Sequence, residues 1–124
     1  MARMKKLKLP PITTVIGEET RIEGNLEFAG GMHLDGVVRG DVTARPQSGA
    51  ALVVSHSGRI QGNVRTDILV LDGTIEGDVV AGERAELAPG AKVTGKVHYR
   101  LLEMAMGAEV CGQLIPLDTT ESTD

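Results

Sequence analysis

One five-residue pattern of apolar and polar positions recurs six times along the 124-residue chain. An apolar residue, a polar residue, a glycine, a second polar residue and a second apolar residue follow one another. The six copies span residues 22–26, 38–42, 60–64, 75–79, 93–97 and 110–114. Apolar and polar positions alternate within each copy, and this period of two is typical of a β-strand. The pattern therefore predicts an all-β chain made of stacked copies of one unit.

The spacing of the copies indicates how the strands are arranged. Consecutive central glycines lie 15 to 22 residues apart, which is enough for about three short strands in each turn of a solenoid. The longest step is explained by a loop around residues 44–50, which contains Pro46, Ser48 and Gly49. Left-handed β-helices are built from strict hexapeptides, whereas the spacing here varies. We therefore predict a right-handed parallel β-helix of about six rungs.

The central glycine of each copy has a specific place in this prediction. By the alternation it should point inward at a bend of the strand, where only a residue without a Cβ atom fits. The residue after each glycine should point outward, which gives a column of Asn25, Asp41, Asn63, Asp78, Lys96 and Gln113. We interpret this column as an outward ladder in which amides separate the acids. The alternative is a site for a cation with oxygen ligands.

The repeat divides the chain into a central domain and two short tails. Residues 14–116 should form the β-helix. Residues 1–13 form a basic N-terminal tail and residues 117–124 a polar C-terminal tail, and both are expected to be disordered. Neither tail resembles the helix or polar cap that closes the ends of monomeric solenoids.

Composition and charge exclude several classes of protein. Aromatic residues make up only 2% of the chain, so the core must consist of small aliphatic side chains. The net charge is −4, but residues 1–10 hold four cations and no acid, so the body is strongly acidic. Such a body is a poor nucleic-acid binder, and we expect no nucleic-acid partner. No apolar run approaches the ~18 residues of a membrane span, and no signal peptide is evident, so we expect a cytoplasmic protein.

Candidate chemistry is sparse. The single cysteine, Cys111, excludes an internal disulfide and a multi-cysteine metal site. His33 and His98 should point outward, and nothing aligns them with His56, so a three-histidine zinc site of the carbonic-anhydrase type is not expected. The chain has no phosphate-binding loop, dinucleotide fingerprint or nucleophile elbow. We therefore predict no catalytic residue, no cofactor and no bound metal.

The six copies, together with Val15-Ile16-Gly17 near their start, resemble the bactofilin family of bacterial cytoskeletal proteins. The resemblance covers residues 14–116 and includes the short basic and polar tails. It implies a compact right-handed β-helix that polymerises end to end without nucleotide. It also implies filaments that lack polarity and attach to the inner membrane surface as scaffolds. Two features depart from the family pattern, namely the long loop near Pro46 and the cysteine at position 111.

The residues support end-to-end assembly independently of the resemblance. Each end of a β-helix presents unpaired backbone groups and the apolar interior of its last rung. Open ends of this kind are expected to stack on one another. The candidate interface residues at the N-terminal end are Val15, Ile16, Ile22, Leu26 and Phe28. The candidates at the C-terminal end are Leu101, Leu102, Val110, Leu114 and Ile115.

The basic tip is a second candidate binding segment. It mixes cations with apolar side chains, and its candidate binding residues are Met1, Arg3, Met4, Lys5, Lys6, Leu7, Lys8 and Leu9. Anionic lipid attracts such a segment by ~1 kcal/mol per Lys or Arg, and many copies along a filament would bind through avidity. A docking motif for a protein partner, or a tip that only aids solubility, remains open.

Together these inferences predict a non-enzymatic scaffold. It would assemble with itself into filaments that position cytosolic or membrane proteins at the inner face of the cytoplasmic membrane. The alternative is a trimeric enzyme with left-handed hexapeptide repeats, either a transferase or a carbonic-anhydrase-like protein.

Overall fold

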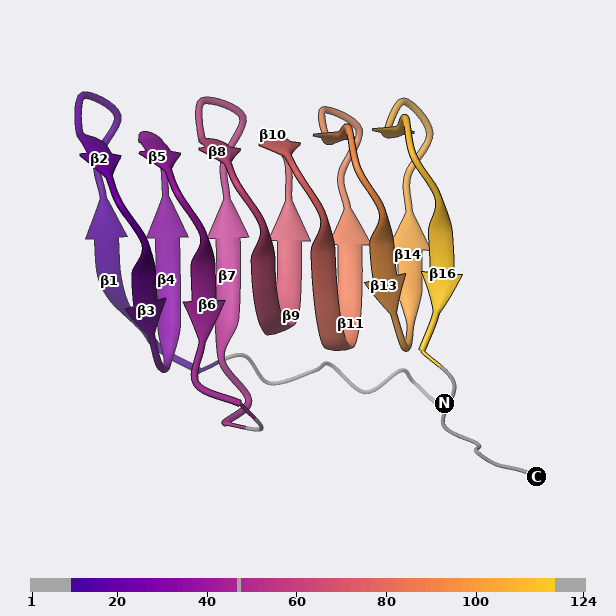
Figure 1. Ribbon diagram of the computed structural model, residues 1–124, viewed down its shortest axis with the longest axis horizontal. Coiled ribbons are helices and arrows are strands. Elements are labelled where there is room, and N and C mark those ends of the chain that lie inside the picture. The colour runs from indigo at the N-terminus through magenta and orange to yellow at the C-terminus, as the bar shows by residue number, and fades with distance from the viewer. Residues whose placement is uncertain (1–9, 47, 118–124) are drawn as a thin grey trace.

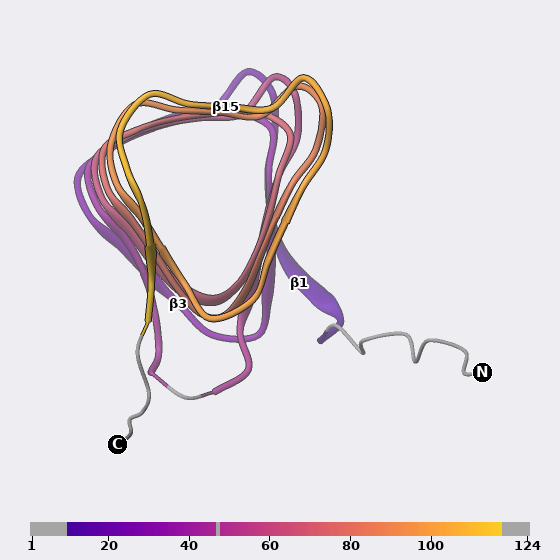
Figure 2. The ribbon, with the colours of Figure 1, turned by 90° about the vertical axis from the view of Figure 1, so that its right-hand side faces the viewer.

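The computed structural model describes residues 10–46 and 48–117. In this part of the chain every pair of neighbouring strands is parallel. The chain coils into a rod of six rungs with a three-sided cross-section (Figures 1 and 2). Each rung contributes one strand segment to each of three faces, so the predicted all-β solenoid is confirmed.

The three faces are named here A, B and C in chain order. Face A consists of β1 (Ile12–Ile16), β4 (Gly31–Leu34), β7 (Ala51–Val54), the second halves of β9 (Val64–Leu71) and β11 (Val79–Leu87), and β14 (Leu102–Met104). Face B consists of β2 (Arg21–Glu23), β5 (Val37–Arg39), β8 (Arg59–Gln61), β10 (Thr74–Glu76), β12 (Lys92–Val93) and β15 (Glu109–Val110). Face C consists of β3 (Leu26–Phe28), β6 (Val42–Ala44), the first halves of β9 and β11, β13 (Val97–Tyr99) and β16 (Leu114–Pro116).

The handedness of the coil follows from the order of the faces. Figure 2 looks onto the C-terminal end, and the chain turns anticlockwise from face A through face B to face C as it approaches the viewer. This sense of turning makes the solenoid right-handed, as predicted. The alternative of a left-handed hexapeptide-repeat enzyme is therefore wrong.

Apolar residues of successive rungs stack directly on one another in the interior. On face B the register places six β-branched side chains in one column: Ile22, Val38, Ile60, Ile75, Val93 and Val110. The four middle members are fully buried, whereas Ile22 and Val110 at the two ends are half-buried. Each copy of the sequence pattern thus supplies one layer of an aliphatic core, and the first and last layers are covered on only one side.

The motif glycines occupy the corner between faces B and C. A Cβ atom on Gly62 would lie 2.2 Å from the carbonyl oxygen of Gly40 in the preceding rung. The prediction that the position excludes a side chain is confirmed, but the predicted inward direction is wrong. Gly62 is half-exposed, and its missing side chain would meet the backbone of the neighbouring rung. The reason is that alternation ends where the chain turns the corner, so the period of two no longer gives the direction.

The column that follows the glycines forms the predicted ladder. Asn25 Oδ1 accepts a hydrogen bond from the backbone N–H of Asp41 at 2.8 Å. Asp41 and Asn63 repeat this contact with the next rung at 2.9 and 3.0 Å, and Asp78 accepts from the N–H of Lys96 at 2.9 Å. One oxygen of each side chain is therefore used to join rungs. The ladder stops at Lys96, since an ammonium group accepts no hydrogen bond.

The start of the solenoid and the position of the long loop can both be compared with the sequence prediction. β1 begins at Ile12, because residues 12 and 13 of the predicted tail continue the first strand beside β4. The connection between β6 and β7 projects from the corner between faces C and A as the expected loop (Figure 1). A loop at a corner lengthens one rung without disturbing the register of the strands on either side.

Candidate polymerisation surfaces

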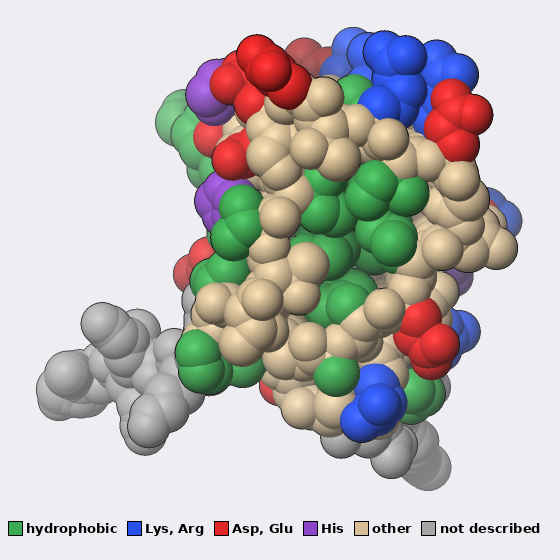
Figure 3. Space-filling view, turned by 90° about the vertical axis from the view of Figure 1, so that its left-hand side faces the viewer, with side chains coloured by type: hydrophobic (Ala, Val, Ile, Leu, Met, Phe, Trp, Pro, Cys, Tyr) green, Lys and Arg blue, Asp and Glu red, His purple; other side chains and the backbone are tan. Residues whose placement is uncertain are grey.

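The N-terminal end of the rod is an open edge. β1, β2 and β3 each pair with a strand on one side only. Ile22 and Leu26 continue inward columns of the core and are half-buried because no rung lies above them. Figure 3 looks onto this end and shows apolar side chains gathered at the centre of a ring of backbone. This end therefore combines unpaired strand edges with an exposed part of the core.

The other three candidates at this end differ in how much they expose. Ile16 and Phe28 belong to the first rung, but they are only 8% and 9% exposed. Val15 is 65% exposed, but it is in register with His33 on the outer side of face A. Ile22 and Leu26 are thus the candidates that form the N-terminal apolar surface, while Val15 lies at its side.

The C-terminal end is the second open edge, formed by β14, β15 and β16. Leu102, Val110 and Leu114 continue inward columns of the core, and Leu114 is 42% exposed. Leu101 is 63% exposed at the corner before β14, and Ile115 lies in the outward column of His98. Three of the five predicted residues therefore form the C-terminal apolar surface.

The structure adds apolar residues that sequence reasoning missed. Met104 ends β14 and is 42% exposed, and Met106 at the next corner is 91% exposed. At the other end Ile12 is 43% exposed. A signal for Met104 was present in the sequence. Met104 takes the place of the apolar residue before a corner glycine, which earlier repeats fill with Leu34, Val54, Leu71 and Leu87. Its place in the last repeat could have identified Met104 as an end residue.

Nothing in the described ranges 10–46 and 48–117 crosses either end of the rod. The outward N–H and C=O groups of six edge strands are consequently available for pairing with another chain. The first rung, residues 10–28, carries four acidic residues and one basic residue. The described residues of this rung are therefore net acidic, whereas the four cations of residues 1–9 precede them in the sequence.

Two of the three histidines lie on different faces of the rod. His33 lies on face A with its Nε2 atom 2.9 Å from Asp35, while His98 lies on face C with Nδ1 3.3 Å from the carbonyl oxygen of Val79. A hydrogen bond from Ser55, together with nearby His33, lowers the pKa of Asp35 from its usual value. Among the residues described, no three His, Cys, Asp or Glu side chains lie close enough together to hold a metal ion.

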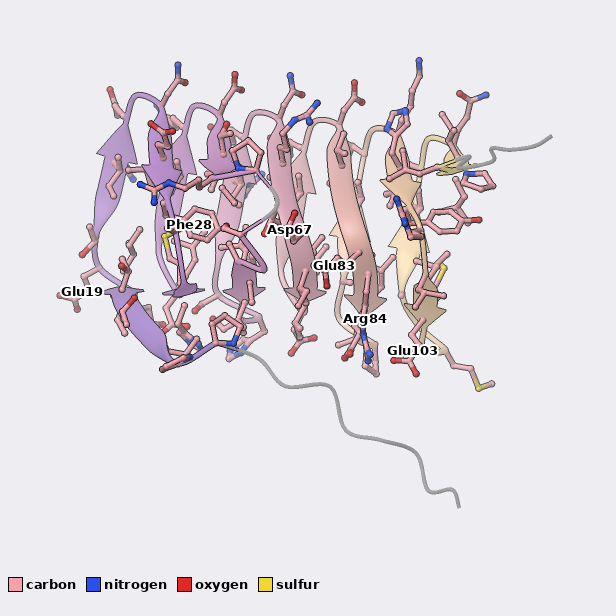
Figure 4. All side chains as sticks on the ribbon, turned by 90° about the horizontal axis from the view of Figure 1, so that it is seen from below. Glu19, Phe28, Asp67, Glu83, Arg84 and Glu103 are labelled. Atoms are coloured by element: carbon pink, nitrogen blue, oxygen red, sulfur yellow. The ribbon has the colours of Figure 1, made fainter. Side chains whose placement is uncertain are left out.

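A groove of about 700 Å³ runs along face C. Arg65, Asp67, Glu83 and Arg100 line it, and Figure 4 shows Asp67 and Glu83 on neighbouring rungs. Charges of both signs line the groove, together with Thr66 and His98. It is a feature of the lateral surface and is separate from the two ends.

The candidate binding residues of the basic tip, residues 1–9, lie outside the described residues. No helix within residues 10–46 and 48–117 has the length and apolarity that a membrane span requires. The placement of the tip relative to the rod therefore stays a prediction.

The comparisons with known proteins agree with this architecture. Residues 14–115 match the family model described as Bactofilin, polymer-forming cytoskeletal. Bactofilin BacO of Myxococcus xanthus is 26% identical over 101 residues, which cover 82% of this chain and 77% of that protein.

Two solved structures share the fold. A cryo-EM reconstruction of Thermus thermophilus bactofilin double helical filaments is 28% identical, has a TM-score of 0.77 and covers 84% of this chain and 99% of its own. The crystal structure of a point mutant of the bactofilin from Thermus thermophilus is also 28% identical, with a TM-score of 0.67 and coverage of 74% and 98%. Since the family model spans nearly the whole solenoid, from its first strand to its last, this chain belongs to the bactofilin family of polymer-forming cytoskeletal proteins.

Proposed function

We propose that this bactofilin is a non-enzymatic scaffold that assembles end to end into filaments. The observation that carries the proposal is the pair of open ends. Each end has three edge strands that are paired on one side only, and a half-buried apolar layer. Stacking would bury Ile22 and Leu26 at one junction surface and Leu102, Val110 and Leu114 at the other. It would also satisfy the edge N–H and C=O groups, so burial and backbone pairing act together against the loss of translational freedom.

Assembly of this kind requires no nucleotide, because burial of apolar surface supplies the driving force. We expect the purified full-length chain to form filaments in nucleotide-free buffer. Six rungs at ~4.8 Å give a repeat of roughly 29 Å along each filament. Electron microscopy tests this directly. Uniform small particles, such as trimers, at high protein concentration would contradict the proposal.

The filaments are further proposed to pair laterally. The Thermus bactofilin forms double helical filaments, and 99% of that chain is covered by the present one. The same arrangement would make the filament of this chain stiffer than a single row of rods.

The basic tip is proposed to hold the filament at the inner face of the cytoplasmic membrane, where the filament would position its protein partners. Residues 1–10 carry four cations, and each contributes ~1 kcal/mol of attraction to anionic lipid. Deleting residues 1–10 should therefore leave filaments intact and reduce co-sedimentation with phosphatidylserine vesicles at least about tenfold.

Deletion of residues 118–124 is the matched control for tail removal, and it should leave vesicle binding unchanged. Neutral phosphatidylcholine vesicles should bind neither the intact chain nor the variants. If the chain without residues 1–10 still sediments with anionic vesicles, the lipid assignment is wrong.

A further inference from the structure

The outward strand positions of face A carry no Asp, Glu, Lys or Arg over the first four rungs, and the one titratable residue there, His33, lies 2.9 Å from Asp35. Val15, His33, Val53 and Val70 lie opposite one another in register on β1, β4, β7 and β9. Val53 and Val70 are half-buried, and each lies between two buried residues of its strand. Two residues earlier on the same strands, Gly31, Ala51 and Ile68 are buried. The four outward residues Val15, His33, Val53 and Val70 are called here the face A patch.

The other lateral surfaces also carry charged residues. Every rung of face B carries a charged residue, and the set is Arg21, Glu23, Arg39, Arg59, Glu76, Lys92 and Glu109. Face C carries Glu27 and Arg65 in its first three rungs. Rungs five and six of face A hold an ion-pair cluster, in which Arg84 bonds Glu86 and lies 3.1 Å from Glu103 (Figure 4). The face A patch spans four rungs without Asp, Glu, Lys or Arg at the outward strand positions, whereas face C has three such rungs, which present Val80, His98 and Ile115.

We propose that the filaments of this chain pair laterally through the face A patch, with a second copy of the same surface as the partner. The inference rests on the proposed function, because it requires filaments. The body of the chain is strongly acidic, so two copies approach with least repulsion where neither carries a charge. The same acidity disfavours an anionic lipid surface as the occupant, since Glu86 and Glu103 border the patch.

The pattern of the patch is compatible with self-association. Two sheets pack face to face at ~10 Å when the side chains between them are of moderate size. A two-fold axis between the second and third rungs would oppose Val15 of one copy to Val70 of the other. The same axis would oppose His33 to Val53. An isologous contact of this type uses one surface twice and needs no second binding site.

The size of the patch determines when pairing occurs. The patch spans four rungs, roughly 19 Å in length and about 13 Å in width, or about 250 Å², whereas a stable interface buries about 800 Å² on each partner. Two isolated copies should therefore not pair through face A. Each further copy in a filament adds the same area without a new loss of translational freedom, so pairing becomes favourable between filaments.

The test replaces Val53 with glutamate or lysine in the full-length chain. The lysine charge would be buried between the filaments without a partner, so the paired fraction in electron micrographs should fall at least about tenfold while single filaments remain. Glutamate would lie opposite His33 and should reduce the paired fraction less. Val80→Glu is the matched control, because Val80 is a half-buried outward valine of face C next to Arg65, and it should keep pairing. Val70→Glu repeats the test one rung away, in case Val53→Glu fails to fold.

The possible outcomes separate the inference from the proposed function. Single filaments in the unmodified chain, or paired filaments in both Val53 variants, would overturn the face A assignment. Loss of all filaments by a folded Val53 variant would also overturn it, because Val53 would then act at the end junction. Only absence of filaments in the unmodified chain would overturn the proposed function. If Val53→Glu weakens binding to phosphatidylserine vesicles while pairing persists, the patch faces lipid and the inference is wrong.

Discussion

Replacing Val110 with arginine is expected to abolish filaments and to leave the solenoid folded. Val110 ends an inward column on β15 and is half-buried, because no rung of its own chain covers it. In an isolated copy the long arginine side chain can reach water at the open end. In a junction its charge would be buried without a partner, at a cost of about 3–5 kcal/mol. Pelleting and electron microscopy should therefore show no filaments, and circular dichroism should show an intact β fold.

Thr94→Arg is the matched control for this substitution. Thr94 is exposed and directly follows Val93, which pairs with Val110. An arginine at position 94 places the same charge on the side of the rod instead of at its end. Filaments should persist in this variant. If Val110→Arg also retains filaments, the C-terminal surface defined by Leu102, Val110 and Leu114 is not the junction.

The same substitution reports on filament polarity when it is combined with Ile22→Arg, which blocks the opposite end. Filaments without polarity contain two kinds of junction, N-terminal to N-terminal and C-terminal to C-terminal. Each single variant should then form discrete dimers through its intact ends, as measured by analytical ultracentrifugation. In a polar filament each variant alone would be monomeric, and dimers would form only on mixing the two.

The interior of the fold could be predicted from the sequence because its signal is local. Alternation within five residues identifies Val38 or Ile75 as inward, and repetition places one such residue in each rung. The first and last copies of the repeat therefore identify Ile22 and Val110 as end residues by their position alone. Alternation cannot predict how much of each end residue is exposed to solvent. Ile16 and Phe28, for example, belong to the first rung but are nearly buried.

Features that depend on several rungs at once could not be predicted in this way. The face A patch joins Val15, Val53 and Val70, which come from rungs of unequal length. Their alignment requires the strand register and the position of the loop between β6 and β7. The direction of the corner glycines is non-local for the same reason, because the atom that excludes a side chain on Gly62 belongs to the preceding rung.

Gly62→Ala should be among the most destabilising small substitutions in the rod. The added methyl group would meet the carbonyl oxygen of Gly40 at 2.2 Å and its carbon at 2.5 Å. Both are backbone atoms of a hydrogen-bonded rung, so relief requires the two rungs to move apart. We expect a loss of at least about 3 kcal/mol, or a Tm lower by roughly 12–24 °C. Thermal unfolding should be measured in the Val110→Arg background, where filament formation does not contribute to stability.

Gly82→Ala is the comparison that isolates the contact between rungs. Gly82 lies within β11 at another corner, and its nearest neighbour would be the flexible carboxylate of Asp67 at 3.4 Å. A methyl group there should change Tm by no more than about 4 °C, since it only displaces a side chain and reduces the freedom of the unfolded chain. Equal destabilisation by Gly62→Ala and Gly82→Ala would show that glycine flexibility in general matters at the corners. A large difference would show that the rungs are held at the corner by a backbone approach that no side chain can enter.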